Sequence, residues 1–97
     1  MITPAQIRAA RAMLDLTIDR LSQESGINAL LILQIESGNG YEATPGDHAM
    51  LRQTLERLGI LFLDSGQAGP GGAGLRLVAA DHQEGMRPEE LNSANND

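Results

Sequence analysis

The chain has 97 residues, enough for one small domain and too few for a dinucleotide-binding fold with a separate substrate domain. The absence of cysteine excludes disulfides and cysteine-ligated zinc, and 41% apolar residues with one Tyr and one Phe predict an aliphatic core. The net charge is −6, and the segment after residue 63 contributes −4 of it through two arginines and six acidic residues. Most of the acidity therefore lies in the C-terminal third, where it weakens the long-range attraction of the chain to phosphate.

The first helix is predicted to begin after Thr3. Pro4 suits the first helical position, and Gln6 stands three residues after Thr3, as in a capping box. The apolar residues that fall on one face of this helix are Ile7, Ala10 and Leu14.

Two further helices follow with only a glycine turn between them. Thr17 is a favourable N-cap for a short second helix that Gly26 ends. Asn28 is a favourable N-cap for a third helix, which runs to about Ser37 and is stopped by Gly38.

A fourth helix is predicted after a loop at 39–46. Thr44 with Pro45 begins it, and Gly59 ends it. Its apolar stripe consists of Leu51, Leu55 and Leu58.

The segment 60–80 is predicted to form a β-hairpin. Residues 60–63 are a short apolar run, residues 75–79 alternate in character, and the glycine-rich stretch 65–74 between them is a turn. Residues 81–97 carry five acids and three Asn with few large apolar groups, which predicts a disordered acidic tail.

A short helix, a glycine turn and a second helix have the spacing of a helix-turn-helix, whose second helix enters the major groove of DNA. Within the segment 3–59, the residues that match a known pattern are Ile7, Arg8, Arg11, Leu16, Thr17, Leu21, Ser22, Ser25–Ile27, Ile32 and Ile35–Gly38. With these residues the segment resembles the Cro/CI (Xre-like) family of bacterial and phage DNA-binding regulators. This resemblance implies a mostly α, lambda-repressor-like bundle of four to five helices over 1–59, followed in small members by a hairpin.

The resemblance also implies roles for individual residues. Arg11 and Glu36 match a structural ion pair, and the amides beside Thr17 match a phosphate contact. The turn after the third helix matches a backbone contact through Ser37, Gly38 and Asn39, and the base-contacting positions are Asn28, Ala29, Leu30, Leu31 and Gln34. Arg8 and Arg20 are further candidates for phosphate contacts, with solvated helix positions as the alternative.

Several residues depart from the family pattern. Ile18 stands where the family usually has a phosphate-binding Gln, and among the base-contacting positions only Asn28 and Gln34 can hydrogen-bond to base edges. Leucines make the third helix apolar nearly all round, and such a helix is normally covered. They either pack under the fourth helix or the hairpin, or touch thymine methyl groups, or form a protein-binding surface; these leucines are Leu30, Leu31 and Leu33.

The predicted function is sequence-specific DNA binding by a transcriptional regulator, with residues 28–37 in the major groove and the 60–80 hairpin as a possible element of homodimerisation. The alternative is a degenerate helix-turn-helix that docks on another regulator or on RNA polymerase through the three leucines. A third possibility is weak DNA contact supplemented by such a partner.

Enzymatic function finds no support in the sequence. Residues 69–74 match G-x-G-x-x-G in letters, but the strand that follows does not suit pyrophosphate binding. His48 and His82 lack neighbours at metal-ligand spacing, and no nucleophile motif is present. We therefore expect no catalytic residue, metal or cofactor.

The expected location is the cytoplasm, associated with the nucleoid and without membrane contact. No apolar run approaches the roughly 18 residues that span a bilayer. The start at residues 1–4 lacks the basic and apolar regions of a secretory signal.

Overall fold

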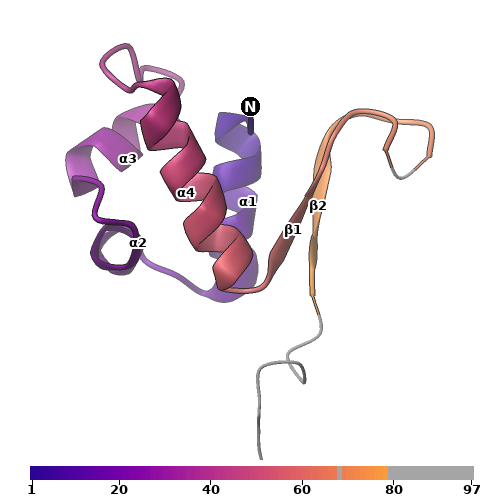
Figure 1. The fold of residues 1–97 in the computed structure, drawn as a ribbon, viewed down its shortest axis with the longest axis horizontal. Coiled ribbons are helices and arrows are strands. Elements are labelled where there is room, and N and C mark those ends of the chain that lie inside the picture. The colour runs from indigo at the N-terminus through magenta and orange to yellow at the C-terminus, as the bar shows by residue number, and fades with distance from the viewer. Residues whose placement is uncertain (68, 79–97) are drawn as a thin grey trace, which may run out of the picture.

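The computed structural model describes residues 1–67 and 69–78, and it confirms a mostly helical fold with a two-stranded antiparallel hairpin (Figure 1). The described part of the chain contains four helices of the expected four to five. The predicted tail at 81–97 and the last two residues of the predicted hairpin lie outside the described residues. The elements are α1 (Pro4–Leu14), α2 (Ile18–Ser25), α3 (Ala29–Glu36), α4 (Pro45–Arg57), β1 (Ile60–Leu63) and β2 (Gly74–Leu77).

All four predicted N-caps are confirmed. Each cap side chain accepts a hydrogen bond from a backbone N–H in the first turn of its helix, which satisfies a donor that has no partner inside the helix. The capping box predicted at α1 is present, and α4 has a second one with Asp47. The four caps are Thr3, Thr17, Asn28 and Thr44.

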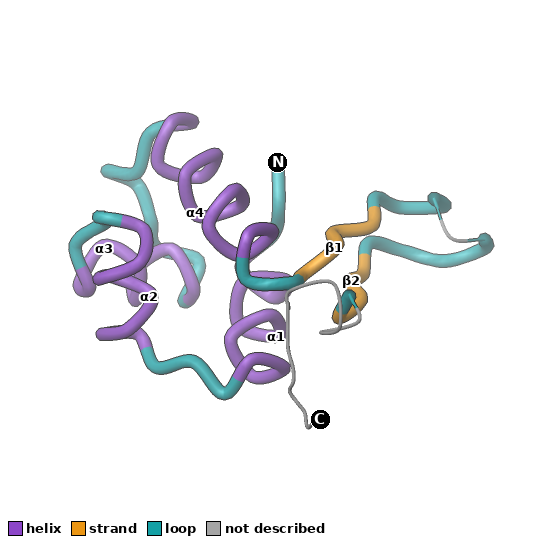
Figure 2. Tube along the Cα trace, turned by 60° about the horizontal axis from the view of Figure 1, so that its bottom comes forward, coloured by secondary structure: helices purple, strands orange, loops and turns teal. Residues whose placement is uncertain are grey.

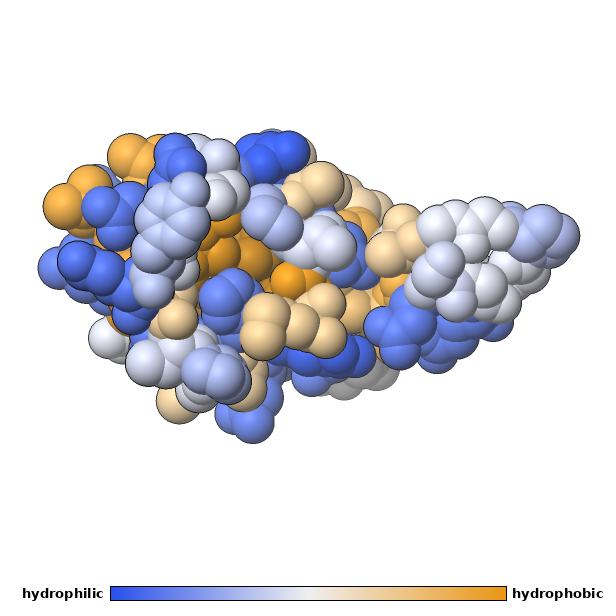
Figure 3. Space-filling model, turned by 90° about the horizontal axis from the view of Figure 1, so that it is seen from above, coloured by the Kyte–Doolittle hydropathy of each residue, from blue (hydrophilic) through white to orange (hydrophobic). Residues whose placement is uncertain are grey.

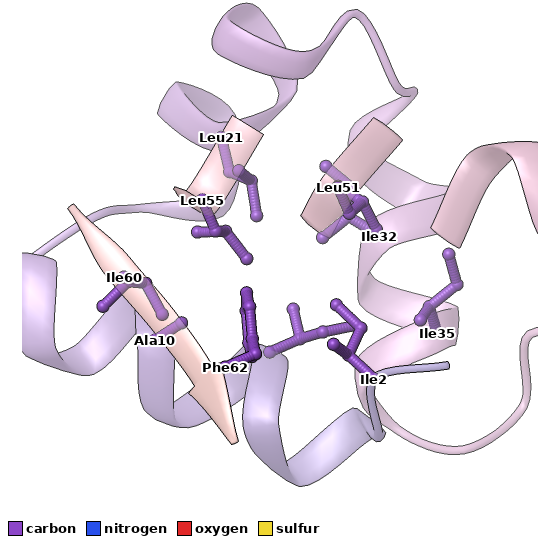
Figure 4. Packing of buried hydrophobic residues seen from close by; sticks show 10 residues of the cluster. Ile2, Ala10, Leu21, Ile32, Ile35, Leu51, Leu55, Ile60 and Phe62 are labelled. Atoms are coloured by element: carbon purple, nitrogen blue, oxygen red, sulfur yellow. The ribbon is translucent and has the colours of Figure 1, made fainter. Parts of the chain in front are cut away.

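The core is aliphatic apart from one aromatic ring and lies between the helices and the inner face of the hairpin (Figure 4). Leu58, predicted in the buried stripe of α4, is only half-buried because it lies just beyond the last helical residue. Thr54 is buried instead, and its hydroxyl donates to the carbonyl oxygen of Met50 at 2.8 Å. The buried apolar residues are Ile2, Ile7, Ala10, Leu21, Ile32, Ile35, Leu51, Leu55, Ile60 and Phe62.

Helices α2 and α3 are joined by the three residues 26–28 and pack against each other (Figure 2). Gly26 ends α2 at φ 76°, a left-handed conformation that costs glycine little. The Ser22 hydroxyl donates to the carbonyl oxygen of Ile27 at 2.6 Å, and the amide of Ile27 donates to the hydroxyl of Ser25 at 3.1 Å. Side chains of α2 therefore fix the turn that sets the start of α3.

The hairpin extends away from the helices on the side opposite α2 and α3 (Figures 1 and 2). Ile60 pairs with Leu77 and Phe62 with Leu75, so these four residues share one face of the two-stranded sheet. Strand β1 packs against α4 and β2 against α1. The hairpin is thus anchored by the buried Ile60 and Phe62 at one face, while its edges remain unpaired in the described residues.

Candidate functional site

The outer face of α3 is apolar and open to solvent. Leu30 is 62% exposed and Leu33 is 50% exposed, whereas Leu31 packs against the core. Of the alternatives for the leucines, burial therefore does not hold for Leu30 and Leu33, whereas Leu31 is half-buried against the core. At the end of the molecule opposite the hairpin, strongly apolar residues lie among hydrophilic ones, and further apolar residues show in the middle of this face (Figure 3).

The only charged side chain of α3 is Glu36, which is buried and paired with Arg11. Nε of Arg11 lies 2.6 Å from one carboxylate oxygen, and Nη2 lies 2.9 Å from the other. Nη1 of Arg11 donates to the carbonyl oxygen of Leu16 at 2.9 Å. Hydrogen bonding to Glu36 raises the pKa of Arg11 against the opposing effect of burial. The structure thus joins the two residues suggested as an ion pair, and the exposed face of α3 carries no charge.

Both arginines suggested as phosphate contacts are exposed but already make one internal interaction. Arg8 donates through Nη1 to the carbonyl oxygen of Glu36 at the C-terminal end of α3. Arg20 donates through Nε to Glu24 one turn along α2, at 3.1 Å. A guanidinium has five N–H donors, so each arginine keeps donors that can reach a phosphate.

Glu24 lies between two arginines from different helices. Besides Arg20, it accepts hydrogen bonds at 3.3 Å from Nη1 and Nη2 of Arg57 in α4. The hydrogen bonds from Arg20 and then from Arg57 lower the pKa of Glu24. This ion pair between α2 and α4 braces the end of α2 that leads into the turn.

The turn after α3 is closed by hydrogen bonds to one carbonyl group. The hydroxyl of Ser37 donates to the carbonyl oxygen of Gln34 at 3.0 Å, and the amide of Asn39 donates to the same oxygen at 2.8 Å. Gly38 between them has φ 84°. The three residues suggested as a backbone contact therefore form one compact exposed turn.

The suggested base-contacting residues lie around the start of α3. The Oδ1 atom of Asn28 accepts from the amides of Leu30 at 2.9 Å and Leu31 at 3.3 Å, so this oxygen is occupied by helix capping. Ala29 and Gln34 are half-buried. A shallow hollow of about 270 Å³ beside the helix is lined by Asn28, Leu30, Leu31, Gln34 and Glu42.

Several of these contacts were not predicted from sequence. The pairing of Arg20 with Glu24 has helical i, i+4 spacing and could have been found, but Arg57 is 33 residues from Glu24. Glu42 looked like an ordinary loop residue, and only the fold brings it to the hollow. His48 lies near the Thr44 carbonyl oxygen, and the described residues hold no cluster of His, Asp and Glu suited to a metal.

No protein-family model and no curated protein matches the sequence. Within the described residues, none of the helices has the length and apolar character needed to cross a membrane.

Proposed function

We propose that the protein is a sequence-specific DNA-binding transcriptional regulator, in which α2 and α3 act as a helix-turn-helix and α3 lies in the major groove. The observation that carries the proposal is the exposed outer face of α3, an eight-residue helix that packs on α1 and α2 and follows a tight turn at Gly26. Helix-turn-helix proteins present their second helix to base edges in this arrangement.

The proposal divides the candidate residues between bases and phosphates. The amides beside Thr17 offer backbone N–H groups to phosphate, and Arg8 and Arg20 offer their remaining guanidinium donors. The amides of Ser37, Gly38 and Asn39 donate to carbonyl groups of α3, so the turn after α3 offers phosphate the side-chain amide of Asn39. The residues that face bases are Asn28, Ala29, Leu30, Leu31 and Gln34. With this division, most of the affinity comes from phosphate contacts and most of the specificity from α3.

We further propose that two copies act together and meet through the hairpin. A lone module of this size contacts few bases. Two modules on a dyad-symmetric site contact twice as many, and so they discriminate better between that site and other DNA. A two-stranded sheet is marginal alone, and the unpaired edges of β1 and β2 can pair with a second copy. Such a regulator works in the cytoplasm, at the nucleoid.

Selection of duplexes from a random library and from sheared genomic DNA tests the proposal. We expect one short dyad-symmetric sequence that is retained at physiological salt. Its affinity should fall with rising salt, with a log–log slope of about −0.9 for each phosphate neutralised. Recovery only of unrelated fragments that dissociate as salt rises would contradict a sequence-specific function.

A second candidate function is docking on another regulator or on RNA polymerase. It is favoured by the exposure of Leu30 and Leu33 on a helix whose outer face has no cation. Binding of this kind buries apolar surface and is therefore nearly independent of salt, unlike DNA binding. If the partner itself binds DNA, linkage to the partner adds to weak contacts made by this chain.

One variant tests the α3 face that both candidates use, and a second variant separates the candidates. Leu30→Glu should abolish either kind of binding while leaving the fold intact, because Leu30 is mostly exposed. Gln34→Ala removes hydrogen-bonding groups from the α3 face, and so it should weaken DNA binding and leave apolar docking nearly unchanged. A loss of protein docking in Gln34→Ala with intact DNA binding would contradict this division.

A further inference from the structure

The hollow beside α3 combines apolar walls with polar groups of different hydrogen-bonding character. Leu30 and Leu31 provide the apolar part, and Glu42 reaches it from the loop between α3 and α4. Asn28 and Gln34 complete the lining. The hollow therefore lies on the same face that we propose enters the major groove.

The polar groups of the hollow differ in what they accept and donate. The Oδ1 atom of Asn28 is occupied by the amides of Leu30 and Leu31, which leaves its Nδ2 group as a donor. Gln34 can donate and accept, and an ionised Glu42 can only accept. The described part of α3 offers no guanidinium or ammonium group to the bidentate acceptor edge of guanine.

We infer that this hollow receives the C5 methyl group of a pyrimidine in the major groove, an inference that rests on the proposed DNA-binding function. In that groove the methyl group of thymine is the apolar feature that a base presents, and apolar side chains contact it. Leu30 is the exposed leucine that lines the hollow, so it packs on the methyl group. Leu33 is exposed on the same helix but does not line the hollow.

Two methylated pyrimidines share this chemistry. Thymine places a carbonyl oxygen beside its methyl group, whereas 5-methylcytosine places an amino group there. The donors of Asn28 and Gln34 suit the oxygen, and Glu42 suits the amino group, since a carboxylate accepts from N4 of cytosine. The hollow thus recognises the methyl group in both, and Glu42 biases the choice toward 5-methylcytosine.

The test uses the duplex recovered by selection, with each thymine replaced in turn by deoxyuridine and each cytosine by 5-methylcytosine. Deoxyuridine lacks only the methyl group. At the thymine that meets the hollow, replacement by deoxyuridine should weaken binding about fourfold. This factor corresponds to the free energy of burying one methyl carbon. Where cytosine occupies that position, its replacement by 5-methylcytosine should tighten binding by a similar factor.

Three variants assign the effect to the hollow. Leu30→Ala should abolish discrimination between thymine and deoxyuridine while the salt dependence stays as in the wild type. Leu33→Ala is the matched control and should keep the discrimination. Glu42→Gln should reduce the preference for 5-methylcytosine over thymine, because the amide replaces an acceptor-only group.

The outcomes separate this inference from the proposed function. A selected duplex that binds specifically, but with equal affinity whichever thymine is replaced and whichever cytosine is methylated, overturns the methyl pocket and leaves the DNA-binding function standing. Discrimination that survives Leu30→Ala and is lost in Leu33→Ala also overturns the assignment. Failure to select any sequence removes the proposed function itself, and the methyl pocket with it.

Discussion

The side-chain amide nitrogen of Gln6 donates to the carbonyl oxygen of Gly74 at 2.8 Å, which connects the first turn of α1 to the start of β2. The same nitrogen lies 3.3 Å from the carbonyl oxygen of Leu63 at the end of β1. The side-chain oxygen of Gln6 accepts from the amide of Thr3 in the capping box. One buried amide therefore closes the helix start and fastens both strands of the hairpin to the helices.

Gln6→Glu should loosen the hairpin. It keeps the oxygen that Thr3 needs but removes the N–H donors, and it places a carboxylate against two carbonyl oxygens. We expect a loss of about 1 to 3 kcal/mol in the free energy of unfolding. The amide of Val78, which donates to the carbonyl oxygen of Gly59 across the hairpin at 2.7 Å, should exchange its hydrogen faster. Gln67→Glu is the control, because the side chain of Gln67 uses only its oxygen, which accepts a hydrogen bond from the backbone amide of Asp64. Equal stability of both variants would argue against this role of Gln6.

Arg11→Ala should be strongly destabilising. It leaves the carboxylate of Glu36, which is 3% exposed, without its charged partner. We expect a loss of about 3 to 5 kcal/mol in chemical denaturation. The double variant Arg11→Ala with Glu36→Gln should regain part of that loss, because no buried charge is then stranded. An unchanged denaturation midpoint for Arg11→Ala would refute the structural role of the pair.

Acid should weaken the link between α2 and α4. The folded-state pKa of Glu24 is lowered by Arg20 and Arg57, so its stabilising effect is fully present above the unfolded-state pKa and is lost as pH falls through the folded-state value. The thermal midpoint of Glu24→Gln should therefore fall below that of the wild type at neutral pH and meet it in acid. A constant difference in thermal midpoint between the wild type and Glu24→Gln from neutral pH into acid would contradict the assignment.

Two glycine substitutions should change stability in opposite directions. A Cβ on Gly40 would lie 2.9 Å from Cγ1 and 3.1 Å from Cα of Ile35, so Gly40→Ala should displace the loop after α3 and cost about 1 to 3 kcal/mol. A Cβ on Gly46 in the first turn of α4 would meet only the hydroxyl oxygen of Thr44, at 3.5 Å, and Gly46→Ala should stabilise by about 0.4 to 1 kcal/mol. Thermal unfolding of both variants measures this difference. Midpoint temperatures that move in the same direction in both variants would contradict it.

The proposed homodimer can be tested at the outer face of the hairpin. Leu61 pairs with Arg76 on the face away from the core and is 41% exposed. If two copies pair along the edge of β1, Leu61→Lys should lower the solution mass to that of a monomer, because a lysine on an edge strand opposes pairing with another strand. Met13→Lys on the exposed side of α1 is the matched control and should leave the mass unchanged. A wild-type mass of one chain at every concentration, with and without DNA, would exclude the dimer.

The helix boundaries were predictable because they depend on neighbouring residues. The caps at Thr3 and Asn28 act on amides two or three residues away, and the glycine that ends α2 needs only its own backbone. The contacts of Gln6 with the hairpin were not predictable, because they join residues 57 and 68 positions apart. Only the packing of β2 on α1 brings these groups together.

The candidate site was predictable in its location but not in its surface. Ile32 and Ile35, two of the residues that carry the resemblance, lie in the core. Helical periodicity could not tell which of the leucines is exposed, because a helix that is apolar on all sides has no polar face to mark the solvent side. The fold turns Leu31 inward and leaves Leu30 exposed, which depends on how α1 and α2 lie against α3.

The uncharged character of α3 also bears on how the chain folds. Residues 29–35 form a run of seven residues without charge, Pro or Gly, which is a composition typical of segments that associate as β-strands when unfolded. The nearest charges, Glu24 and Glu36, flank this run as residues that oppose aggregation. Arg11 pairs with Glu36 only when α1 packs against α3, so before that contact forms we expect the carboxylate of Glu36 to oppose association of this run with other chains.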